Sequence, residues 1–272
     1  MNTARFLGLG GPQWILIVSI VSTACLLPDA FAGHYRRAFV RRVQYVPFIT
    51  GSVLVVCAAG TVLWPDQPWL HVPLLSAAWI ALASGVIGSA VHAYFGTFAK
   101  PGGYRWTLHY AMYGAPVLAP LALSANGFLT LVAGRALMGR FDVGGVPLGI
   151  TLFGAAALSL TGAAVQAAIL HYRGAFNNPL MYLPVTAPLA AVIALVAMIV
   201  RPSAWTEGVL IVALWATIAV GIVGLGMHLR GFDRQMGGLG IALANWLQGP
   251  PAFAPALFTC FAAVGLIAVY LF

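Results

Sequence analysis

Four histidines hold matched positions in the two halves of this sequence, and each follows a long apolar stretch: His34, His92, His171 and His228. Gly88 and Gly224 lie four residues before the second and the fourth of them, which on a helix places each glycine one turn from the imidazole. Two facing imidazoles with a flat space beside them suit the axial ligation of a planar macrocycle. We therefore expect His34 with His92, and His171 with His228, to be the metal ligands of two haem b groups.

Arginine follows three of these histidines at a spacing of two residues, as Arg36, Arg173 and Arg230. A guanidinium in that position would reach a haem propionate at the membrane interface. A structural explanation is also available, because stripes of small residues let helices pack closely in lipid, and His, Tyr and Arg commonly anchor helix ends at the interface. The sequence leaves the cofactor site and the structural explanation both open.

The elements that would position these residues are membrane-spanning helices. Of the 272 residues, 61% are hydrophobic and 7% charged, and the mean hydropathy is +0.95, whereas a soluble domain carries about 25% charged residues. The apolar runs are continuous rather than alternating, which favours helices over an outer-membrane barrel. We predict an all-α integral membrane protein with no soluble catalytic domain. Eight predicted transmembrane helices cover residues 13–33, 46–64, 74–98, 110–135, 147–171, 181–200, 206–228 and 250–271.

The chain reads as a tandem duplication of a four-helix unit. The stretch "HYRRAFVRRVQYVP" at 34–47 matches "HYRGAFNNPLMYLP" at 171–184 at seven of fourteen positions, and "GAPVLAP" at 114–120 matches "GPPAFAP" at 249–255. We predict one repeat over residues 1–138 and a second over 148–272, joined by a Gly-rich outer linker at 139–147. Because four is an even number, the repeats share one orientation and are related by a pseudo-two-fold axis along the membrane normal.

The Lys and Arg residues, thirteen in all, divide unequally between the two sides that these helices define. One side receives nine of them: Arg36, Arg37, Arg41, Arg42, Lys100, Arg105, Arg173, Arg230 and Arg234. By the positive-inside rule this side is cytoplasmic, which places both termini outside and the chain in the inner membrane of a bacterium. The net charge of +8 is then a topology signal, and we expect lipid but no nucleic acid as a partner. The first predicted helix resembles a secretory signal, but its counterpart at 147–171 indicates a membrane span.

Prolines and one acid add detail to this layout. Pro120 and Pro255 lie one turn deeper than Pro116 and Pro251 in the fourth and the eighth predicted helix, where each should kink the helix and free a carbonyl. We expect mainly a role in helix shape, although freed carbonyls also suit a small quinone-sized pocket. Asp29 is an acid inside a predicted span, and its counterpart is Gln166. A hydrogen-bonding role common to both fits this pair better than proton transfer.

Three functions remain for such a chain. It has no phosphate-binding loop, no nucleophile elbow and no zinc-protease motif, and its cysteines Cys25, Cys57 and Cys260 all lie inside predicted spans. Our first hypothesis is an electron-transfer subunit of a membrane oxidoreductase complex, not catalytic alone, that binds haem b, interacts with quinone and contacts protein partners. The alternative is a cofactor-free membrane anchor or assembly subunit for a partner protein. A small transporter is the third hypothesis.

Overall fold

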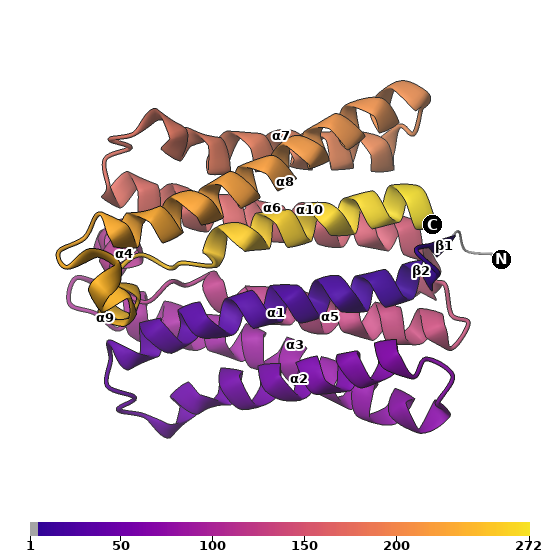
Figure 1. Ribbon diagram of the computed structural model, residues 1–272, viewed down its shortest axis with the longest axis horizontal. Coiled ribbons are helices and arrows are strands. Elements are labelled where there is room, and N and C mark those ends of the chain that lie inside the picture. Colours follow the sequence, from indigo (N-terminus) through magenta and orange to yellow (C-terminus); the bar gives the residue numbers. More distant parts are fainter. Residues whose placement is uncertain (1–4) are drawn as a thin grey trace.

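The computed structural model describes residues 5–272, which form a bundle of long helices lying side by side (Figure 1). Seven of the described helices are long and apolar enough to cross a membrane, so the chain is a helical multi-pass membrane protein. The long helices are α1 (Gly11–Tyr35), α2 (Val46–Leu63), α3 (His71–Ala93), α5 (Ala119–Leu137), α6 (Leu148–Arg173), α7 (Leu183–Val200), α8 (Ala204–Asp233) and α10 (Ala254–Leu271). The helix α5 is the one of these eight that does not reach that apolarity.

Short elements close the two ends of the bundle. Two antiparallel hairpins, β1 (Arg5–Phe6) with β2 (Leu9–Gly10) and β3 (Asp142–Val143) with β4 (Val146–Pro147), precede α1 and α6. The second hairpin lies within the predicted linker 139–147. The remaining short elements are η1 (Arg42–Tyr45), η2 (Pro68–Leu70), the π-helical turn η3 (Tyr94–Phe98), η4 (Gly103–Trp106), α4 (Thr107–Tyr113), η5 (Pro179–Tyr182), η6 (Gly238–Ile241) and α9 (Ala242–Gln248).

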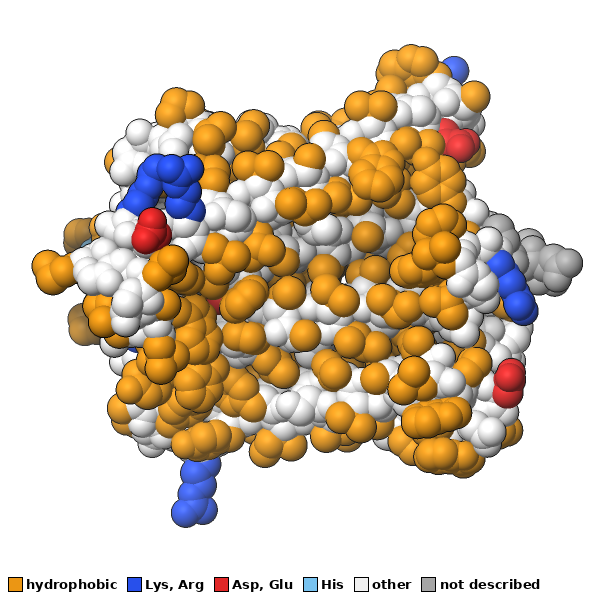
Figure 2. Space-filling view, viewed as in Figure 1, with side chains coloured by type: hydrophobic (Ala, Val, Ile, Leu, Met, Phe, Trp, Pro, Cys, Tyr) orange, Lys and Arg blue, Asp and Glu red, His pale blue; other side chains and the backbone are white. Residues whose placement is uncertain are grey.

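The two ends of the bundle differ in what they hold. The C-terminus and the two hairpins lie at one end, here called the terminal end, and α4 and α9 lie at the other, here called the histidine end (Figure 1). Apolar side chains cover the middle of the face seen in Figure 2, and most of its charged side chains lie toward the two ends. This distribution is the one expected of a protein whose middle contacts lipid.

The predicted fourth span, 110–135, was wrong as a continuous helix. The short helix α4 ends at Tyr113, residues 114–118 are not helical, and α5 starts at Ala119. The predicted eighth span, 250–271, is also shorter than expected, because residues 249–253 are not helical and α10 starts at Ala254. Proline explains both interruptions, since it lacks the N–H that a helix interior needs and disfavours a helical conformation in the residue before it.

Packing divides the long helices into two groups of four, here called the first half (residues 5–138) and the second half (residues 148–272). In the first half α1, α2, α3 and α5 contact one another in a ring, and in the second half α6, α7, α8 and α10 do the same. The contacts of α1 with α10, and of α5 with α6, join the halves. The largest core cluster draws residues from all eight long helices and includes Ile15, Leu16, Leu129, Leu152 and Leu160.

Candidate functional site at the histidine end

The structure brings all four predicted histidines to one end of the bundle. His34 and His171 lie near the ends of α1 and α6, and His92 and His228 lie toward the ends of α3 and α8. Each of the four is half-buried. In the first half, the imidazole centroids of His34 and His92 are 6.0 Å apart and their planes are inclined by 67°. His34 and His92, which the sequence predicted to pair, therefore lie close together in space.

A proline-freed carbonyl binds one histidine in each half. The Nδ1 atom of His92 lies 2.9 Å from the carbonyl oxygen of Pro116, and Nδ1 of His228 lies 2.6 Å from that of Pro251. These carbonyls lie four residues before Pro120 and Pro255, where the proline has no N–H to offer them. Because a carbonyl only accepts hydrogen bonds, Nδ1 carries the proton, and Nε2 of the neutral ring keeps a lone pair.

The other histidine of the first half has the opposite tautomer. Nδ1 of His34 lies 3.3 Å from Nε2 of Gln44, whose Oε1 accepts a 2.9 Å hydrogen bond from the backbone N–H of Arg41. That second bond orients the Gln44 amide, so its NH₂ group donates to His34 and the proton of the neutral ring lies on Nε2. Within about 6 Å, the first half thus holds one imidazole with a free N–H and one with a free lone pair.

The second half lacks this arrangement around its first histidine. Met181 occupies the position that corresponds to Gln44, and a thioether cannot donate a hydrogen bond. Nδ1 of His171 is buried, with no hydrogen-bond partner among the described residues. No side chain fixes the tautomer of His171 as Gln44 fixes that of His34, and the polar group beside this imidazole is the backbone of Met181.

We expected the two glycines to leave a flat space beside each imidazole, but prolines of the neighbouring helix fill the space beside these glycines. A Cβ atom built on Gly88 would lie 3.1 Å from Cβ of Pro120, and one built on Gly224 would lie 3.1 Å from Cβ of Pro255. Gly88 and Gly224 thus allow α3 to approach α5 and α8 to approach α10, as small residues do between helices in lipid. This contact favours the packing explanation for the two glycines.

The arginines of the motif reach across the centre of the bundle. Nη1 of Arg36 donates a 2.7 Å hydrogen bond to the carbonyl oxygen of Gly249, and the guanidinium carbon of Arg173 lies 5.3 Å from the centre of the Tyr113 ring. Desolvation lowers the pKa of Arg36, and the nearby Asp29 carboxylate opposes that shift. Arg230 is also exposed, at the end of α8, but no hydrogen bond or ring contact of its guanidinium is found among the described residues. Arg36 and Arg173 thus each contact the opposite half at or beside the place where its helix is interrupted.

Asp29 and Gln166 cap the two interrupted helices, again across the halves. The carboxylate of Asp29 accepts hydrogen bonds from the backbone N–H groups of Ala252 (2.8 Å) and Phe253 (2.9 Å), just before α10. Oε1 of Gln166 accepts one from Leu118 (3.2 Å), just before α5. The first N–H groups of a helix have no partner within it, and a side-chain acceptor supplies one. The hydrogen-bonding role predicted for this pair agrees with these contacts.

The repeated His-Tyr-Arg-x-Ala-Phe motif builds a turn that our sequence analysis missed. Four of its residues have positive φ angles between 47° and 55°: Ala38, Phe39, Ala175 and Phe176. Such angles are unfavourable for residues other than glycine. The ring of Phe39 stacks on Tyr45 at 4.8 Å, and the corresponding rings in the second half stack at 4.5 Å. The signal in the sequence was a Phe followed six residues later by Tyr, present in both halves.

No family model, curated protein sequence or solved structure matches this chain. Among the described residues, no group of three or more His, Cys, Asp or Glu side chains could hold a metal ion. A function must therefore be argued from the geometry of the histidine pairs and their neighbours.

Proposed function

We propose that the chain is the membrane-embedded electron-transfer subunit of a redox complex, and that His34 and His92 bind the ring of a quinone. The observation that supports this is the pair of opposite tautomers fixed by Gln44 and by the Pro116 carbonyl. A quinone carbonyl accepts a hydrogen bond, which the N–H of His34 can donate. The hydroxyl of the reduced quinol donates one, which the lone pair of His92 can accept.

Haem b is the second option for the same pair. Two metal–nitrogen bonds of about 2 Å each, together with the ring radii, agree with the 6.0 Å between the imidazole centroids. The carbonyl behind Nδ1 of His92 is also the usual partner of a metal-ligating histidine. At His34, however, the Gln44 amide donates to Nδ1, so the nitrogen that would face a metal carries the proton. For this reason we rank haem b below quinone.

A cofactor-free anchor or assembly subunit is the alternative. It is supported by the number of polar side chains already used to hold the fold, namely Asp29, Arg36 and Gln166. Under this alternative, replacing His92 and His228 together by Ala leaves the binding of partner proteins intact. Transport is the third candidate: interrupted helices are frequent in transporters, but side chains of the chain itself cap both interruptions.

We also propose the number of membrane spans, the origin of the two halves and the orientation of the chain in the membrane. In it, α5 completes eight spans, the halves are copies of one four-helix unit, and the histidine end faces the cytoplasm of a bacterial cell, with both termini outside. The paired hydrogen bonds of His92 and His228, and the nine basic residues that the chain order assigns to the histidine end, support this proposal. Labelling of cysteines added at either terminus, by a reagent that does not cross the membrane, tests the orientation.

The function is tested by the binding of decylubiquinone, a short-tailed quinone, to the protein purified with any subunits that remain attached. We expect His34→Ala to weaken the binding of decylubiquinone about tenfold, because the quinone carbonyl loses the N–H donor of His34. His92→Ala should weaken the binding of the reduced form, decylubiquinol, about tenfold, because the quinol hydroxyl loses its acceptor. The matched variants His171→Ala and His228→Ala control for general effects and should leave the affinity unchanged. Absence of binding by the unaltered protein would contradict the proposal. A reduced-minus-oxidised spectrum of the same sample with haem b bands, lost in His92→Ala, would favour haem instead.

A further inference from the structure

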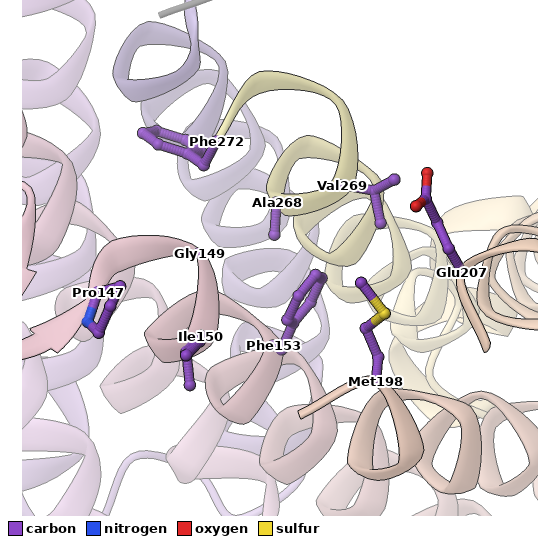
Figure 3. Close-up of a pocket in the computed structure, with 9 residues that line it drawn as sticks. All are labelled: Pro147, Gly149, Ile150, Phe153, Met198, Glu207, Ala268, Val269 and Phe272. Atoms are coloured by element: carbon purple, nitrogen blue, oxygen red, sulfur yellow. The ribbon is translucent and has the colours of Figure 1, made fainter. Parts of the chain in front are cut away.

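A pocket of about 300 Å³ opens at the terminal end of the second half (Figure 3). It is lined by residues of α6, α7, α8 and α10, so it lies at the mouth of that group of four helices. Phe153, Met198 and Phe272 supply apolar side chains from three of these helices. Figure 1 shows the hairpin of α7 and α8 diverging from α10 at this end, which explains why the mouth is open.

In the first half, three positions that correspond to residues lining the pocket are buried. At the offsets that align the two halves, Leu16 corresponds to Phe153, Thr61 to Met198 and Ala133 to Ala268, and all three are fully buried. The fold of four helices therefore does not itself require an open mouth.

The chemistry of the lining indicates what the pocket can accept. Its one charged side chain is Glu207, which lies in the first turn of α8. Figure 3 shows the Glu207 carboxylate beside Val269, on the opposite side of the pocket from Phe272. A matching ligand has an apolar body and a positively charged group about one side chain away from it.

We propose that this pocket binds one phospholipid with an amine headgroup, with part of an acyl chain among Phe153, Met198 and Phe272 and the ammonium group paired with Glu207. The position at the end of the membrane-spanning helices places the rim near lipid headgroups. The volume is at the low end of about 300–1,000 Å³ for small-molecule sites, too narrow for a partner helix about 10 Å across. This proposal does not depend on the proposed function.

Native mass spectrometry of the purified protein tests this, with phosphatidylethanolamine and phosphatidylglycerol of identical acyl chains added separately. We expect one bound phosphatidylethanolamine, retained at least fivefold better than phosphatidylglycerol. Glu207→Gln should remove this preference without preventing lipid binding, because the apolar lining remains. Equal retention of the two lipids by the unaltered protein would overturn the proposal.

A variant whose new side chain fills the pocket provides a second test of the proposal. A Cβ atom on Gly149 would lie 3.7 Å from Cβ of Phe272, whereas one on Gly154 would have no atom within 4 Å. Gly149→Leu therefore fills the pocket and should abolish the retained lipid, and Gly154→Leu, in the same helix, should not. Retention by Gly149→Leu, or displacement of the lipid by decylubiquinone, would mean that the pocket is not an amine-lipid site.

Discussion

His34 has a hydrogen-bond partner in Gln44, whereas His171, 137 residues further along, has Met181 at the corresponding position and a buried Nδ1 without a described partner. The neighbouring histidines do not differ in this way, since His92 and His228 each use a backbone carbonyl. The halves thus share one histidine environment and differ in the other. The difference suggests that the shared contacts maintain the fold, and that the contacts specific to one half are where function can be sought.

The helix caps show the same pattern. Asp29 accepts two backbone hydrogen bonds and carries a charge, whereas Gln166 accepts one and is neutral. The position is structural in both halves, but the first half supplies the stronger acceptor.

The largest difference should come from the caps. Asp29→Ala leaves two N–H groups before α10 without an acceptor, and we expect it to lower the free energy of unfolding by about 3 kcal/mol. Gln166→Ala leaves one such group before α5 and should cost about 1 kcal/mol. Both are measured by denaturation in one detergent, with Asn in place of Asp29 as the control for charge. Equal losses for the two Ala variants would remove the difference between the caps.

The glycines nearest the prolines should give a smaller difference. A Cβ atom on Gly85 would lie 2.5 Å from the carbonyl oxygen of Pro120, and one on Gly221 would lie 2.9 Å from that of Pro255. Backbone must move in both cases, so we expect Gly85→Ala to cost about 2 kcal/mol and Gly221→Ala about 1 kcal/mol. Gly162, in α6, has no atom within 4 Å of its built Cβ. Gly162→Ala is therefore the control, and a similar cost there would show that the contacts with proline are unimportant.

The turns should behave alike in both halves. Ala38 and Ala175 have φ angles of 55° and 54°, a region that glycine adopts without steric cost. Ala38→Gly and Ala175→Gly should therefore each stabilise the protein by about 0.5 kcal/mol, after the entropy cost of glycine is subtracted. Thermal unfolding of the two variants checks this. A destabilised protein, or a clear difference between the variants, would contradict the view that these turns are equivalent.

The sequence predicted the membrane class, most of the long helices and the shared end at which the histidines lie, because these follow from apolar periodicity and chain order. It also predicted carbonyls freed by Pro120 and Pro255, since that follows from the chemistry of proline. It did not predict that these carbonyls bind histidine, or that Pro120 fills the space at Gly88, because those contacts join different helices. The break at residues 114–118 was missed because hydropathy windows average over a few unwound residues.

The proposed role of the first half is tested most directly by exchanging Gln44 and Met181. Gln44→Met gives His34 the surroundings of His171, and Met181→Gln does the reverse. With decylubiquinone affinity as the measurement, we predict binding five- to tenfold weaker in Gln44→Met, because the N–H of His34 is no longer fixed on Nε2. Met181→Gln, the matched variant, should not weaken binding. Unchanged affinity in Gln44→Met, or a loss in Met181→Gln alone, would contradict a quinone site at His34 and His92.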